Sequence, residues 1–126
     1  MKKAVFALFL LGLLVGVSLW NLLHLKALTE ELTGGIESAR AYWLAEDYES
    51  AENTLDRVLK RWLDSDGYTH IFIRHSEIDA ASDIFYDLHR DILARDAESA
   101  EANAEKLLYH LQSIYSMERL SMKSIF

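Results

Sequence analysis

Residues 4–25 form a run of 22 residues without a single charged side chain. Residues 4–23 alone would make roughly 30 Å of helix, which matches the hydrocarbon thickness of a bilayer. A core helix of a soluble domain normally keeps one polar face, whereas this run is apolar on every face. We therefore predict that residues 1–25 are an N-terminal membrane anchor and that residues 26–126 form a separate domain.

A cleaved signal peptide is the main alternative, because it also begins with basic residues and an apolar stretch. Its apolar region is usually shorter and ends in small residues of the Ala-x-Ala kind. The best candidate site here, residues 16–18 (GVS), is followed by the bulky Leu19 and Trp20. An uncleaved anchor is therefore favoured.

The charges that flank the apolar run predict its orientation. Lys2 and Lys3 precede the run, whereas Lys26 after it is followed by the acidic Glu30 and Glu31. Positive flanks stay in the cytoplasm. We expect a single-pass protein of the cell membrane, with a cytoplasmic N-terminus and an extracytoplasmic body.

The body of the protein is strongly acidic. All twenty Asp and Glu residues lie in residues 27–126, with only ten of the thirteen Lys and Arg. A net charge of about −10 repels phosphate backbones and anionic lipid headgroups, so we expect no nucleic-acid partner. The absence of cysteine excludes a disulfide, a cysteine-based zinc site and a thiol nucleophile.

Helical spacing of apolar residues runs through the whole body, which contains no proline. Gly34 and Gly35 interrupt the first apolar stripe and suggest a hinge between anchor and body. The four stripes are Leu25, Leu28, Leu32, Ile36, Ala39 and Trp43; Ala51, Leu55, Val58, Leu59 and Trp62; Ile78, Ala81, Phe85, Leu88 and Ile92; and Ala100, Ala104, Leu107, Leu108, Leu111 and Ile114.

An internal repeat relates the stripes to one another. Residues 44–51 read LAEDYESA and residues 93–100 read LARDAESA, at a spacing of 49. Asp47 and Asp96 are predicted helix N-caps. Each copy resembles the turn of a tetratricopeptide-type hairpin, although the spacing exceeds the usual period of 34. The fold class predicted is all-α: a transmembrane helix followed by an antiparallel four-helix bundle made of two similar hairpins. A peptide-binding groove is a weaker functional interpretation of the same repeat.

Two segments are less informative. Residues 71–73 (IFI), between the hairpins, are compatible with a short extended piece or with a helix. Residues 116–126 carry enough apolar side chains, Met117 and Leu120 among them, to fold back over the core.

The best local candidate for a metal site is the segment around His75. His75, Asp79 and Asp83 share one helical face at four-residue steps, with Glu77 nearby. The paired histidines of a zincin helix are absent. A helix start, with Ser76 as N-cap and acids in the first turn, explains the same residues and is favoured. We therefore predict neither a metal nor another cofactor.

No catalytic arrangement stands out elsewhere in the chain. There is no glycine-rich phosphate loop, no G-x-S-x-G elbow and no C-x-x-C. Trp43 and Trp62 occupy helical stripes and are predicted to be core residues and not carbohydrate platforms. We expect that the protein is not an enzyme.

Several of these features together resemble a bacterial family, domain-of-unknown-function family 4363. They are the basic start with its apolar run, the turn A-E-D-Y-x-x-A at residues 45–51, Trp62, and H-S-E-I-D at residues 75–79. The second acidic turn and the apolar tail add to the likeness, which covers nearly the whole chain. The resemblance implies a membrane-attached helical protein, mainly of Gram-positive-type bacteria, and it implies no catalytic residues.

The expected function is that of a non-enzymatic, membrane-anchored, extracytoplasmic interaction or scaffold protein. Its partners would be the membrane, through residues 4–25, and another membrane or envelope protein. The alternative is an extracytoplasmic metal- or ligand-binding sensor or hydrolase that uses residues 75–79.

Overall fold

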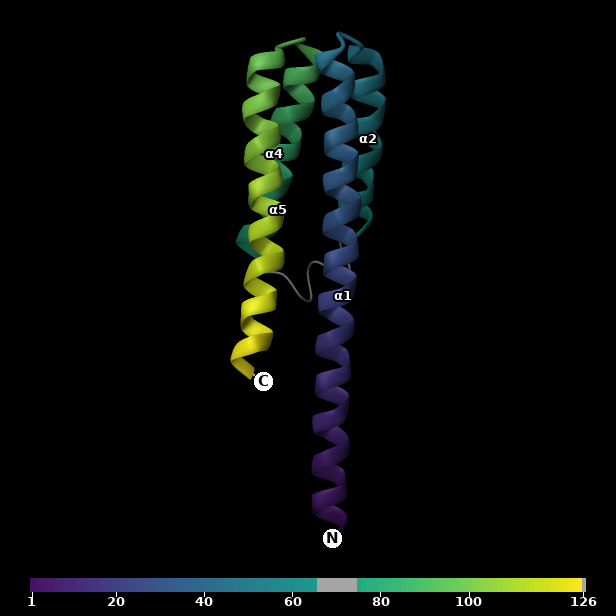
Figure 1. Ribbon diagram of the computed structural model, residues 1–126, viewed down its shortest axis with the longest axis vertical. Coiled ribbons are helices and arrows are strands. Elements are labelled where there is room, and N and C mark those ends of the chain that lie inside the picture. The colour runs from purple at the N-terminus through teal and green to yellow at the C-terminus, as the bar shows by residue number, and fades with distance from the viewer. Residues whose placement is uncertain (66–74, 126) are drawn as a thin grey trace.

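Helices make up every regular element in the described part of the chain. The computed structural model describes residues 1–65 and 75–125. Its helices are α1 (Lys2–Leu44), α2 (Tyr48–Asp64), α4 (His75–Leu93) and α5 (Ala97–Ile125) (Figure 1). The prediction of an all-α protein is confirmed, while residues 71–73 lie outside the described residues.

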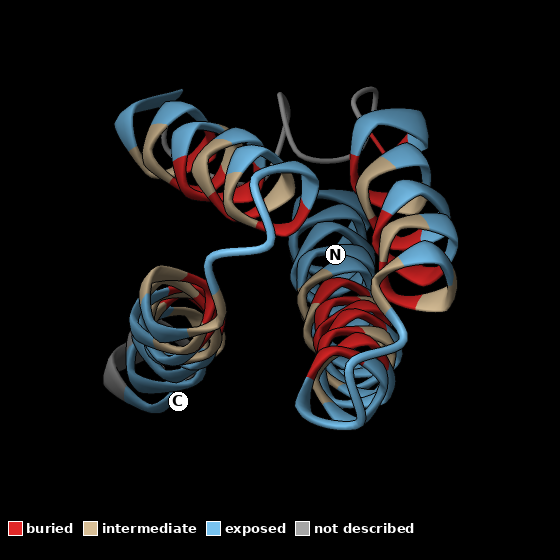
Figure 2. Cartoon of the chain, turned by 90° about the horizontal axis from the view of Figure 1, so that it is seen from above, coloured by how far each residue is buried: buried red, intermediate tan, exposed pale blue. Residues whose placement is uncertain are grey.

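The helices form two antiparallel hairpins that pack against each other. α1 pairs with α2 and α4 pairs with α5, and the hairpins meet where α1 contacts α5 and α2 contacts α4. Seen from above, the buried residues of the four helices face a common centre (Figure 2). This is the predicted antiparallel four-helix bundle.

α1 is one unbroken helix with two different surfaces, and its N-terminal half projects beyond the bundle (Figure 1). Near the N-terminus its apolar side chains are exposed, for example Phe6 at 63% and Leu14 at 55%. From Leu25 to Trp43 the same helix buries one stripe in the bundle. By length and composition α1 is able to cross a membrane or to act as a signal sequence, and only 6% of its most apolar 18-residue stretch is buried.

The predicted hinge at Gly34 and Gly35 is wrong, because α1 continues through both residues. Gly35 instead allows α2 to approach α1 closely. A Cβ atom at Gly35 would lie 2.3 Å from Cγ2 of Val58, whereas one at Gly34 would meet nothing within 4 Å. The packing of α1 on α2 therefore requires a residue without a side chain at position 35.

The four apolar stripes form the core as predicted, with Leu59 and Leu108 partly buried at its edge. The 49-residue spacing seen around the turns extends along all four helices, since buried positions of the first hairpin correspond to buried positions of the second. These pairs are Leu32/Ala81, Ile36/Phe85, Ala39/Leu88, Trp43/Ile92, Ala51/Ala100, Leu55/Ala104, Val58/Leu107 and Trp62/Leu111.

Both hairpin turns have the same backbone structure. Glu46 and Arg95, which occupy equivalent positions, have positive φ angles of 63° and 56°. In each turn the N–H of the next residue donates to the carbonyl five residues earlier, as Asp47 does to Tyr42. This is the Schellman motif, which satisfies the last carbonyls of a helix.

The residue after each Schellman turn caps the following helix, as predicted. Asp47 accepts a hydrogen bond from the backbone N–H of Ser50 at 3.2 Å, and Asp96 accepts one from Ser99 at 3.1 Å. The side chains thus satisfy N–H groups that have no partner within the helix.

The predicted folding back of residues 116–126 is wrong. Residues 116–125 continue α5, which extends past the level of the bundle beside the lower part of α1 (Figure 1). Met117 is 41% exposed and Leu120 is 62% exposed, so neither residue covers the core.

Candidate functional site

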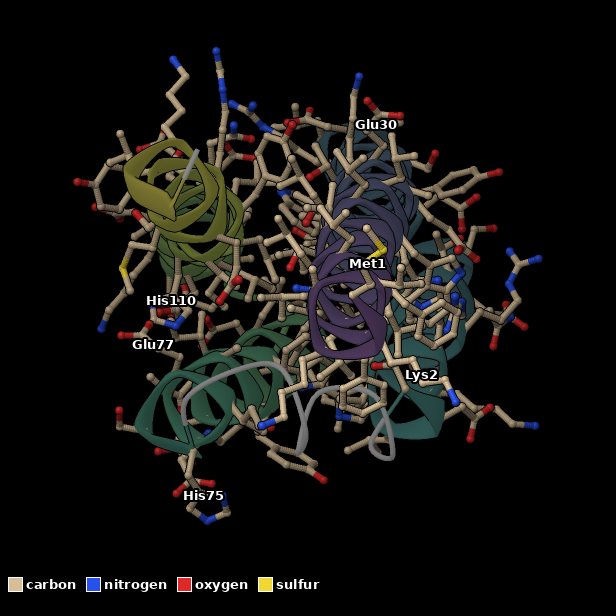
Figure 3. All side chains as sticks on the ribbon, turned by 90° about the horizontal axis from the view of Figure 1, so that it is seen from below. Met1, Lys2, Glu30, His75, Glu77 and His110 are labelled. Atoms are coloured by element: carbon tan, nitrogen blue, oxygen red, sulfur yellow. The ribbon has the colours of Figure 1, made fainter. Side chains whose placement is uncertain are left out.

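The segment around His75, named above as a weak metal candidate, begins α4. α4 begins at His75, so Ser76 lies within the first turn and the prediction that it is the N-cap is wrong. His75 Nε2 lies 3.7 Å from Asp79 Oδ2, and both side chains are highly exposed. Asp83 is also exposed, one turn further along α4. His75 points away from the bundle at its outer edge (Figure 3).

Glu77 is directed to a different histidine. The Nε2 atom of His110, on α5, lies 3.1 Å from the Glu77 carboxylate and 3.1 Å from the Glu77 backbone carbonyl (Figure 3). Both side chains are partly buried. Glu77 therefore joins α4 to α5 within the second hairpin and is not a neighbour of His75 in a shared site.

A polar cluster that sequence reasoning missed joins the two hairpins. Arg40, on α1, donates from Nε to both carboxylate oxygens of Glu101, on α5, at 3.1 and 2.9 Å. The Arg40 Nη2 atom lies 2.8 Å from Glu101 Oε2. Trp43 Nε1 donates to Glu101 Oε1 at 2.7 Å. The Glu101 carboxylate thus accepts hydrogen bonds from the Arg40 guanidinium and from the indole N–H of the buried Trp43.

The ionisation of Glu101 reflects this environment. Burial by itself raises the pKa of the carboxyl, but the hydrogen bonds from Arg40 and Trp43 and the charge of Arg40 outweigh it. The pKa of Glu101 therefore lies below its ordinary value. The hydrogen bond and charge of Glu101 in turn raise the pKa of Arg40. Both groups are ionised at neutral pH and hold α1 to α5.

A second missed cluster joins α2 to α4. His89 Nε2, on α4, lies 2.8 Å from Asp56 Oδ1, on α2. Glu52 lies one turn before Asp56, and one ligand atom from each of the three side chains falls within 4.8 Å of the others. Glu52 and His89 are partly buried and Asp56 is exposed. An imidazole and two carboxylates are a donor set that divalent transition metals accept.

Trp43 and Trp62 belong to the core, as predicted. Trp43 is 1% and Trp62 is 3% exposed. The Nε1 atom of Trp62 donates to Ser82 Oγ at 3.0 Å, and its ring stacks on Phe85 with 6.1 Å between centroids. Neither ring offers a face to a carbohydrate.

A groove follows the contact of α1 with α2. Gly34 and Gly35 line it from α1, and Arg57 and Arg61 line it from α2. Arg61 Nε donates to Glu31 Oε2 at 3.0 Å across the groove. It lies on the outside of the first hairpin and not between the hairpins.

Fold and sites together define a helical protein with one long apolar N-terminal helix, whose second half enters a bundle of two hairpins. The family model described as "Domain of unknown function (DUF4363)" matches residues 19–125, and the chain belongs to this family. The matched region contains the entire bundle and begins after most of the exposed apolar part of α1. No curated protein and no solved structure matches the chain.

Proposed function

We propose that this protein is a membrane-anchored, extracytoplasmic interaction protein without catalytic activity. The main support for this proposal is that the N-terminal part of α1 exposes apolar side chains, whereas its C-terminal part packs in the bundle. Residues 4–23 expose apolar side chains over a length suited to a bilayer, whereas from Leu25 onward the helix is part of the bundle. An exposed apolar surface of this size needs a covering, and lipid fits its uniform, uncharged character.

Because α1 is continuous, the bundle would stand directly on the membrane. Lys2 and Lys3 favour a cytoplasmic N-terminus, and with this orientation the acidic bundle would lie outside the cytoplasm. The polar pairs Arg40 with Glu101 and His110 with Glu77 each join two helices of the bundle, as structural contacts do. These features support an adaptor or scaffold for another membrane or envelope protein.

Labelling of a single cysteine tests the topology, because the natural chain has none. Ala102 is exposed on α5 at the far end of the bundle from the anchor, so Ala102→Cys leaves the core intact. A membrane-impermeant maleimide applied to intact cells should label this variant at full-length mass. Leu14→Cys, in the middle of the apolar segment, is the matched control and should stay unlabelled.

Labelling of Ala102→Cys only after lysis would place the bundle in the cytoplasm and refute the proposed location. Labelling at a mass reduced by about 2 kDa, the size of a signal peptide, would refute the anchor.

Photo-crosslinking tests the interaction itself. Tyr109 is 77%, Tyr86 is 52% and Tyr42 is 41% exposed, and each lies on a different helix. Replacement of one tyrosine at a time by a photoreactive phenylalanine analogue keeps the size of the side chain. A specific adduct from one position, absent when the buried Phe85 is replaced, would support a partner surface. Absence of an adduct at all three tyrosines in cells would argue against it.

A further inference from the structure

The internal repeat relates the two inter-hairpin clusters to each other. At the spacing of 49 residues, His89 is equivalent to Arg40 and Glu52 is equivalent to Glu101. The same spacing relates α1 to α4 and α2 to α5. The contact of α1 with α5 therefore corresponds to the contact of α4 with α2. Within these two contacts, the pair of Arg40 and Glu101 corresponds to the pair of His89 and Glu52.

The second carboxylate of each cluster follows the same relation. Asp56 is equivalent to Glu105, whose charge acts on Arg40. Each cluster thus has two acids four residues apart on one helix, facing one nitrogen side chain of another helix. In the first cluster this side chain is a permanent cation, while in the second it is an imidazole, which is neutral in its metal-binding form.

The geometry of the second cluster suits a shared ion. Two ligands of one zinc ion at distances of about 2.0–2.2 Å lie roughly 3–3.5 Å apart. The separation of His89 Nε2 and Asp56 Oδ1 is 2.8 Å, and Glu52 completes a group within 4.8 Å. Small rotations of these partly exposed side chains bring three ligand atoms around one point, with the remaining positions open to water.

We propose that Glu52, Asp56 and His89 bind a divalent transition-metal ion that fastens α2 to α4. The ion supplies the positive charge that Arg40 supplies at the equivalent position of the other interface. The mixed nitrogen and oxygen donors favour an ion of the Zn²⁺ type over Ca²⁺ or Mg²⁺, which prefer oxygen ligands alone.

The test is Zn²⁺ binding by the full chain in detergent micelles, purified without a histidine tag. Equilibrium dialysis should show one tightly bound Zn²⁺ per chain, and thermal unfolding should shift upward with added Zn²⁺. His89→Arg introduces into this cluster the residue type that Arg40 provides at the equivalent position of the other cluster. This variant should fold without metal at least as stably as the natural protein and should bind Zn²⁺ more than about tenfold more weakly, since even changes behind the ligands cost 10–100-fold.

Two further variants keep the result interpretable. Asp56→Asn removes an exposed ligand with little risk to the fold and should also weaken binding. His75→Ala removes an exposed histidine outside the cluster and should leave binding unchanged. The proposal is overturned if the natural chain binds no more Zn²⁺ than His89→Arg, or if His75→Ala abolishes binding while Asp56→Asn does not.

Discussion

Removal of the Glu101 carboxylate would have two separable consequences. In Glu101→Ala, the Nε1–H group of Trp43 loses its acceptor inside a side chain that is 1% exposed. A buried donor left without a partner costs about 1–3 kcal/mol. Arg40 also loses its partner, but its side chain is 34% exposed and turns to solvent, so this loss is minor. We expect Glu101→Ala to lower the free energy of unfolding by about 2 kcal/mol, most of it from Trp43.

Glu101→Gln separates the two contributions. The amide oxygen still accepts the hydrogen bond from Trp43, whereas the ion pair with Arg40 disappears. This variant should therefore lose less than half as much stability as Glu101→Ala. Glu105→Gln is the matched control, because Glu105 is exposed on the same helix and no hydrogen bond involves its carboxylate in the described part of the chain. Denaturant unfolding of the full chain in detergent, followed by tryptophan fluorescence, measures all three values.

The pH dependence follows from the lowered pKa of Glu101. A carboxyl group whose pKa is lower in the folded state than its unfolded value of about 4.3 stabilises the protein above that pH. This contribution is lost as the pH falls through the folded pKa. The natural protein should therefore lose stability on acidification below about pH 4.3 more steeply than Glu101→Gln does. Equal acid sensitivity of the two proteins, or equal losses for the Gln and Ala variants at pH 7, would refute the assignment of Trp43 and Arg40.

Two backbone positions give further predictions. Glu46→Gly and Arg95→Gly should each stabilise the protein by about 0.5–1 kcal/mol in thermal unfolding, because left-handed conformations suit glycine at a helix C-terminus; a loss in both would contradict the turn assignment. Gly35→Ala should destabilise it by about 1–2 kcal/mol, since its Cβ meets the stiff side chain of Val58. Gly34→Ala, which meets nothing, should be neutral or stabilising by up to about 1 kcal/mol, and identical effects at both glycines would rule out the proposed close contact.

Those parts of the fold that depend on local pattern were predictable. The core stripes follow from helical spacing, and the N-caps Asp47 and Asp96 follow from residue type next to a repeated turn. The close contact at Gly35 was not predictable, because it depends on the position of Val58 along another helix. The sequence alone does not distinguish a glycine pair that bends a helix from one that lets a neighbouring helix pack closely.

The candidate site was less predictable than the fold, for a related reason. Spacing within one helix drew attention to His75 and Asp79, but such spacing brings ligands together from one side only. Of the other candidate in this segment, Glu77, the structure shows that its carboxylate faces His110 on α5 and not His75. The cluster with His89 combines two helices that are far apart in the sequence, so no local motif marks it.

The repeat nevertheless contains information about these sites when its two copies are compared residue by residue. Arg40 and Arg61 of the first hairpin are equivalent to His89 and His110 of the second, and all four contact a carboxylate. At these two positions the second hairpin thus has an imidazole where the first has a permanently charged guanidinium. At His110 the nitrogen faces one carboxylate and one backbone carbonyl of the same residue, Glu77, so the site offers a single carboxylate ligand beside the imidazole. At His89 two carboxylates, from Glu52 and Asp56, lie within 4.8 Å of the imidazole, so the site offers three metal ligands. This difference is why a metal ion is proposed at His89 and not at His110.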